Sequence, residues 1–290
     1  MSLVLDHLPP LVTFRITALA LEPQRLPPLP TTAFHGALGS LEGLDALRPR
    51  AEQPSGQGVT DRPPSPLVIA PSCHERRAPS LELGAGDTVS FRLTLIGHRA
   101  MAGHELVLQR VEAALRRGLG VSLTDRTRRP PLLLVEVARV ELPRLPSLEQ
   151  GCALRFVTPV RLTDGGSIAR DIDAPLLWRS LLRRADTLSR CYGGGPLVDA
   201  LELEPPFEVV DRRLEQVSVT RYSSRQGAEM TWPGQVGSLL LQGDLAPVAP
   251  LLTFGAAVQL GKATTFGLGL YWLLPAHAHA GRAAARRRLA

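Results

Sequence analysis

The 290-residue sequence has no asparagine, one lysine and only three cysteines. Cys73, Cys152 and Cys191 are odd in number and far apart, so they predict neither a disulfide framework nor a zinc site. No stretch of about eighteen uncharged apolar residues occurs, and the N-terminus lacks a basic region followed by a long apolar run. From these absences we expect no membrane span, no secretory signal and no metal, and hence a cytoplasmic protein.

Aromatic residues are also scarce, at 4% of the chain, which argues against recognition of RNA by a broad stacking sheet. Basic residues are in excess: the net charge is +6 and the pI is about 10.0. This balance favours a polyanionic partner. All 33 basic residues except Lys262 are arginines. The planar guanidinium suits phosphate, although a GC-rich genome produces the same bias.

Apolar periodicity divides the chain into two similar halves. In the first half, alternating apolar residues predict strands and a three-to-four-residue spacing predicts helices. Thr31 or Thr32 can cap the first helix. The order is strand, helix, strand, strand, helix, strand, over residues 11–20, 33–47, 66–70, 88–97, 102–118 and 131–142. A Pro/Gly/Gln-rich loop without periodicity is expected at 51–66.

The same order of elements follows a proline-bearing junction at 142–151. We predict the second set at 153–162, 175–191, 207–223, 236–245, 246–260 and 265–274. No repeat is detectable residue by residue. The element order predicts an α+β protein with two tandem ferredoxin-like (βαββαβ) domains. We place the domains at 1–148 and 149–276, followed by a basic tail at 277–290.

A glycine-rich string lies between the last helix and the last strand: Gly261-Lys262-Ala263-Thr264-Thr265-Phe266-Gly267-Leu268-Gly269. Three glycines let the backbone approach a ligand, and consecutive amides there can cradle phosphate. The string is not a P-loop, because it follows a helix and lacks the Lys-Ser/Thr pair. A turn that only aims the strand is the alternative. Because the single lysine falls inside so short a window, we favour a phosphate contact.

A second candidate is His35, in the string FHGALG on the first predicted helix. Histidine is the side chain best suited to exchange a proton near neutral pH. RNA carries its own nucleophile, the 2′-hydroxyl, so one histidine and a cationic phosphate clamp suffice to cut the strand without metal. A histidine that packs against the facing glycines is the alternative. No histidine or cysteine cluster has metal-ligand spacing.

The third candidate is the string RYSSRQ at the end of a predicted strand. Its Arg221, Tyr222 and Arg225 form a plausible RNA contact, and a charged hairpin tip is the alternative.

In this order, the three strings resemble the CRISPR repeat-processing endoribonuclease family of the repeat-associated mysterious protein (RAMP) superfamily. The resemblance spans most of the chain: FHGALG, PLVIAP, FRLTLIG, LRFVTPVRL, LLRRADTLSRCYGG, RYSSRQ, LLQGDL and LGKATTFGLGLYWL. The last string is similar to the family's C-terminal glycine-rich loop and is the most diagnostic.

The resemblance implies two ferredoxin-like domains and cleavage inside the repeat of precursor CRISPR RNA, a step in antiviral defence. The products expected are a 2′,3′-cyclic phosphate and a 5′-hydroxyl, and no cofactor is implied. His35 matches the family's general acid or base. The RNA-binding set would comprise Gly261, Lys262, Thr264, Thr265, Gly267, Gly269, Arg221, Tyr222 and Arg225.

One family pattern is missing. Some members pair the histidine with a tyrosine and a lysine in the first domain, whereas the tyrosines here are Tyr192, Tyr222 and Tyr271. Stabilisation of the charged phosphorane would therefore fall to arginines or to Lys262.

The alternative function is a non-catalytic RAMP subunit that binds guide RNA within a CRISPR effector complex. An unrelated basic enzyme of two α+β domains would require an accidental match of the glycine-rich string. In the first two cases the partner is CRISPR repeat RNA or the processed crRNA, and we expect a monomer or homodimer.

Overall fold

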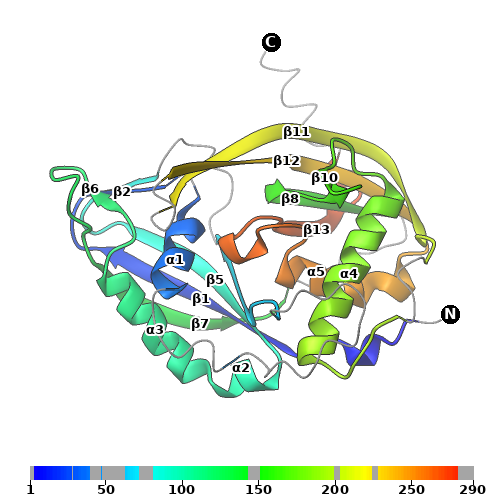
Figure 1. The fold of residues 1–290 in the computed structure, drawn as a ribbon, viewed down its shortest axis with the longest axis horizontal. Coiled ribbons are helices and arrows are strands. Elements are labelled where there is room, and N and C mark those ends of the chain that lie inside the picture. Colours follow the sequence, from blue (N-terminus) through cyan, green and yellow to red (C-terminus); the bar gives the residue numbers. More distant parts are fainter. Residues whose placement is uncertain are drawn as a thin grey trace, which may run out of the picture.

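Two four-stranded antiparallel sheets form the framework of the molecule (Figure 1). The computed structural model describes residues 3–27, 29–39, 47, 63–71, 81–142, 151–198, 203–223 and 228–279. The sheets have the orders β3-β5-β1-β7 and β11-β12-β8-β13. In both, the second, third, first and fourth strands of a βαββαβ unit lie side by side, which confirms the tandem ferredoxin-like prediction.

The first unit has its helices on one face of its sheet. Phe34 stacks on Phe91 at 4.9 Å between ring centroids, joining the first helix to the sheet. The predicted helix at 102–118 corresponds to one helix, His104–Arg116; a short helix that was not predicted, His98–Ala102, precedes it and is separated from it by Gly103. The elements are β1 (Leu11–Ala20), α1 (Pro30–Gly39), β3 (Leu67–Pro71), β5 (Thr88–Ile96), α2 (His98–Ala102), α3 (His104–Arg116) and β7 (Leu132–Val140).

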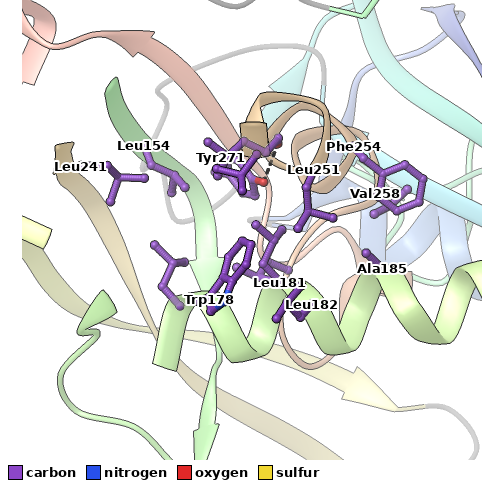
Figure 2. Close-up of a cluster of buried hydrophobic side chains, with 14 of the residues drawn as sticks. Leu154, Trp178, Leu181, Leu182, Ala185, Leu241, Leu251, Phe254, Val258 and Tyr271 are labelled. Atoms are coloured by element: carbon purple, nitrogen blue, oxygen red, sulfur yellow. Dashed lines mark hydrogen bonds between the residues drawn. The ribbon is translucent and has the colours of Figure 1, made fainter. Parts of the chain in front are cut away.

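The second unit has the larger helix and the larger core. Figure 2 shows Trp178 and Leu181 packing against Leu251 and Tyr271. The Tyr271 hydroxyl donates to the carbonyl of Leu252 at 2.7 Å, so this buried polar group is satisfied. The elements are β8 (Cys152–Val160), α4 (Ala174–Tyr192), β11 (Phe207–Ser223), β12 (Ala228–Gly243), α5 (Ala249–Val258) and β13 (Tyr271–Pro275).

Strands β11 and β12 form a long hairpin that arches from the second unit toward α1 (Figure 1). The strand predicted at 236–245 is the second strand of this hairpin, and its predicted start is eight residues later than that of β12. Pro233, Gly234 and Gly237 interrupt the apolar alternation and hide the earlier part of the strand. Pro233 lies beyond the stretch of β12 that pairs with β8, which starts at Gln235. The amide missing at Pro233 therefore costs no bond to β8.

Hydrogen bonds join the two units. Gln259 is fully buried, and its side-chain amide donates to the Ile69 carbonyl at 2.8 Å. The Tyr192 hydroxyl donates to the Pro64 carbonyl. Val68 of the first unit belongs to the hydrophobic core of the second. The two units thus share buried surface.

Four expectations need correction. The first helix begins at Pro30, so Thr31 and Thr32 lie inside it and do not cap it. The last strand starts at Tyr271, since Thr264–Phe266 forms a 3-10 turn. His279, expected in a tail, is buried against β11 and β12. Short elements were missed: η1 (Leu5–His7), β2 (Gln24–Leu26), β4 (Leu81–Leu83), β6 (Val121–Ser122), β9 (Thr163–Asp164), β10 (Ser167–Ile168), η3 (Ala246–Val248) and η4 (Thr264–Phe266).

Several predictions fall outside the described residues. These are residues 51–62 of the predicted loop, residues 40–46 of the first predicted helix, and the basic tail from residue 280 onward. The predicted domain boundary at 148/149 lies in the undescribed segment 143–150 and stays a prediction. Among the described residues, no helix is long and apolar enough to cross a bilayer.

Candidate functional site

The glycine-rich loop runs along the end of β8. The Gly261 φ is 87°, a left-handed conformation, and a Cβ on this residue would lie 2.6 Å from the Arg161 carbonyl oxygen. Gly269 is tighter, since its Cβ would lie 1.8 Å from the Leu260 carbonyl oxygen. The Lys262 amide donates to the Arg161 carbonyl at 2.9 Å, and the Gly269 amide donates to the Pro159 carbonyl at 3.0 Å. Both glycines are therefore required for backbone packing.

This packing revises the expected phosphate cradle. The amides of Lys262, Phe266, Gly267, Leu268 and Gly269 already donate to protein carbonyls. Among the described residues, those of Ala263, Thr264 and Thr265 have no such partner. Ala263 has φ 63°, in the left-handed region, and Lys262 beside it is exposed. The part of the loop open to an anion is thus narrower than the sequence predicted, at residues 262–265.

Helix α1 packs directly on this loop. The Thr31 hydroxyl donates to the Phe266 carbonyl at 2.8 Å, across 235 residues of sequence. Gly267 has φ 89°, and a Cβ there would lie 2.3 Å from Thr31 Oγ1. A glycine at 267 is therefore what lets the helix approach the loop so closely.

His35 lies one helical turn beyond Thr31 and meets the same loop. Its half-buried ring contacts Phe266 edge-on, with 4.3 Å between centroids and 61° between planes. Phe266 in turn lies 4.9 Å from the ring of Trp232 on β12. The structure thus brings together two of the three predicted strings, His35 and the glycine-rich loop, from opposite ends of the chain.

The described residues of the third string, 221–223, lie at the far end of β11. Arg221 and Tyr222 pair through the backbone with Met230 and Glu229, while Arg225 lies outside the described residues. Val219, two residues before Arg221, packs with Trp232 in a small cluster that includes Leu268. Two residues of strand span roughly 7 Å, so the Arg221 backbone lies close to the loop.

Two residues at this site were not predicted. Trp232 sits in AEMTWPGQ, where proline and glycine hide the strand. Arg161 is one of 32 arginines, and nothing in the sequence distinguishes it. Its Nε donates to the Pro233 carbonyl at 2.9 Å, and its guanidinium carbon lies 5.9 Å from the Trp232 ring centre. Within the described residues, no cluster of three or more His, Cys, Asp or Glu side chains offers a metal site.

A protein-family model matches part of the second half of the chain. Residues 154–271 match the family model of the CRISPR-associated endoribonuclease Cas6. This range contains two of the three strings that carried the resemblance, RYSSRQ and the glycine-rich string, and not the string with His35. No curated protein sequence matches the chain.

Solved structures share the fold of nearly the whole chain. A partial Cas6-RT-Cas1–Cas2 complex matches with a TM-score of 0.59 and 14% identity, over 92% of this chain and 46% of that one. The chain thus spans less than half of that relative. A Cas6 (TTHB231) product complex matches with a TM-score of 0.56 and 19% identity, over 91% of this chain and 100% of that one. Thermus thermophilus Cas6 (TTHB231) matches with a TM-score of 0.52 and 17% identity, over 92% of this chain and 99% of that one.

Proposed function

We propose that this Cas6-type protein of the RAMP fold is an endoribonuclease that binds CRISPR repeat RNA and cuts precursor crRNA without a metal ion. The single observation that carries the proposal is the placement of His35 against the glycine-rich loop. It brings a proton-transfer group onto the loop that also carries an exposed lysine and a turn with unused amides.

The reaction requires only these groups. The 2′-hydroxyl of one nucleotide attacks the adjacent phosphorus, and the bond to the next nucleotide's 5′-oxygen breaks. One proton leaves the 2′-oxygen and one reaches the 5′-oxygen, giving a 2′,3′-cyclic phosphate and a 5′-hydroxyl. His35 moves one of these protons, which is worth about 10²- to 10⁴-fold in rate. Lys262 and the amides of residues 263–265 stabilise the charge on the phosphorane.

The remaining predicted contacts position the RNA. Thr265 is half-buried and belongs to the open part of the loop, whereas Thr264 is buried, so its proposed contact is through the backbone amide. Gly261, Gly267 and Gly269 act by shaping the loop. We retain Arg221, Tyr222 and Arg225 as RNA contacts; the backbone pairing of Arg221 and Tyr222 in the hairpin supports the first two.

Incubation of the purified protein with repeat RNA in EDTA tests this function. The control substrate carries a 2′-deoxy sugar immediately upstream of the cut. We expect cleavage of the normal RNA at one site and none of the control. Tight binding without cleavage of either RNA would instead support the non-catalytic guide-RNA subunit, in which His35 only packs against Phe266.

The wider setting is part of the same proposal. We propose a cytoplasmic protein, a monomer or homodimer, whose partner is CRISPR repeat RNA or crRNA. A larger CRISPR assembly is a further candidate partner, since a matched structure is a Cas6-RT-Cas1–Cas2 complex.

A further inference from the structure

Arg161 follows the last residue of β8 and lies at the base of the glycine-rich loop. A parallel bridge joins Arg161 to Gly261, and the Arg161 carbonyl accepts the Lys262 amide at 2.9 Å. Bridged backbones lie roughly 5 Å apart. The two cations, Arg161 and Lys262, are therefore neighbours through the backbone, although 101 positions separate them in the sequence.

The guanidinium of Arg161 is held in one orientation. Its Nε donates to the Pro233 carbonyl at 2.9 Å, and its guanidinium carbon lies 5.9 Å from the centre of the Trp232 ring. Among the described residues, neither Nη atom has an acceptor and no carboxylate pairs with the side chain. The arrangement fixes the inner edge of the guanidinium and leaves the two outer amino groups available.

A line of rings connects this arginine to the reactive histidine. His35 contacts Phe266 at 4.3 Å, Phe266 contacts Trp232 at 4.9 Å, and Trp232 contacts the Arg161 guanidinium at 5.9 Å. Arg161 is thus part of the same site as His35 but does not touch it. An anion bound by Arg161 would lie beside the reacting phosphate rather than on it.

We infer that Arg161 binds a backbone phosphate next to the scissile one, with Trp232 and the Pro233 carbonyl holding its guanidinium in place. The inference rests on the proposed function and adds a positioning residue that neither the sequence nor the comparisons assign. The planar fork of arginine presents two parallel donors to phosphate oxygens.

Burial supports this assignment. Partial desolvation lowers the pKa of Arg161, and no acid among the described residues offsets the cost. A half-buried cation of this kind gains a counter-ion when a phosphate arrives. Arg212, by contrast, lies 3.6 Å from Asp171 and Arg179 lies 2.9 Å from Asp164, so their charges are already balanced.

Salt dependence of RNA binding provides the test. The affinity of the wild type, Arg161→Gln and the control Arg183→Gln for repeat RNA is measured at several KCl concentrations. Arg183 is exposed on α4, in the same half of the chain. We expect Arg161→Gln to lower the slope of log K against log salt by about 0.7, the value for one phosphate contact on a single strand. Arg183→Gln should leave the slope unchanged.

Two further variants separate contact from folding. Arg161→Lys keeps the charge and loses the fork, so we expect the slope to be retained and the affinity to fall. Trp232→Leu should weaken binding less in the Arg161→Gln background than in the wild type, because part of its effect acts through the Arg161 contact and the rest through its packing on Phe266.

The outcomes are distinguishable. A wild-type slope and affinity in Arg161→Gln would overturn the role of Arg161 and leave the proposed endoribonuclease intact. Failure of the wild type to bind repeat RNA would remove the proposed function itself.

Discussion

The first helices of the two units, α1 and α4, occupy equivalent positions in the fold but differ in what stabilises them. Helix α4 has 19 residues, and the Asp173 carboxylate caps it by accepting the Leu176 amide at 2.8 Å. Asp186 and Arg190 add an ion pair one turn apart. Helix α1 has 10 residues, includes Gly36 and two threonines, and is shorter than an isolated helix needs to be stable in water.

This difference shows which contacts hold the candidate site in place. Helix α4 combines core packing with a cap and an ion pair of its own, whereas α1 relies on its contacts, notably the Thr31 hydrogen bond to Phe266. His35 lies on the helix that depends on the other unit. The position of the proposed catalytic histidine is therefore coupled to the docking of the two halves, and the following variants probe that coupling from the largest expected effect to the smallest.

Among the variants that probe this coupling, Gly267→Ala should give the largest effect. The new Cβ would lie 2.3 Å from Thr31 Oγ1 and would push α1 off the loop. We expect cleavage to fall on the order of 10- to 100-fold, because displacements near 1 Å cost that much at a reacting centre. Single-turnover kinetics measure it.

Gly86→Ala is the matched control for this variant. Gly86 has φ 90°, against 89° at Gly267, but a Cβ there meets nothing within 4 Å. Both variants carry the strain of a left-handed alanine, about 1–2 kcal/mol. Equal cleavage by the two would show that α1 does not need its close approach to the loop.

Thr31→Val should have an intermediate effect. It removes the hydroxyl that joins α1 to the other unit and leaves the Phe266 carbonyl without that donor, at a cost of about 1–3 kcal/mol. Thr32→Val removes a comparable bond within the same unit, to the Leu29 carbonyl at 2.8 Å. Hydrogen exchange in α1 and cleavage rates should be more perturbed in Thr31→Val. A larger perturbation in Thr32→Val than in Thr31→Val would contradict the dependence of α1 on the other unit.

Asp173→Ala should affect stability alone. Loss of the N-cap of α4 costs about 1 kcal/mol in the free energy of unfolding, measured by urea denaturation. Cleavage should stay at the wild-type rate, since α4 takes no part in placing His35. A loss of activity at unchanged stability would mean that α4 contributes to the site.

The smallest effect concerns the C-terminal segment docked on the hairpin. Partial burial opposes ionisation of Asp211, but hydrogen bonds from His279 and Arg213 outweigh it and lower its pKa. A lowered carboxyl pKa stabilises the fold above the unfolded value, near 3.9, and that contribution fades as pH falls through the folded pKa. The stability gap between wild type and Asp211→Asn should therefore be present at pH 7 and shrink below about pH 4. A gap that widens in acid would contradict this.

The sequence predicted the regular framework well. Residues 11–20 and 207–223 are strands with the predicted limits, because alternation of apolar residues records a half-buried sheet. The first eight residues of β12 were missed, because this part of the strand extends past β8 and contains Pro233. The alternation of apolar residues does not predict a stretch of strand that is held by backbone pairing with its hairpin partner.

The site was predicted in part. His35 and the glycine-rich string could be singled out because each is chemically unusual in this sequence. Their contact could not be predicted, since Thr31 and Phe266 are 235 positions apart. Arg161 was invisible for another reason: its orientation depends on the Pro233 carbonyl and the Trp232 ring, and an arginine-rich sequence gives no sign of either.

The most direct test of the central claim is the single-turnover cleavage rate of His35→Ala in EDTA, with Gly36→Ala and His104→Ala as controls. Gly36→Ala adds a Cβ with nothing within 4 Å, and His104 is another half-buried histidine of the first unit, stacked on Phe14. The account predicts a rate lower by about 10²- to 10⁴-fold in His35→Ala, unchanged RNA affinity, and near wild-type rates in both controls. Cleavage by His35→Ala at the wild-type rate would contradict it.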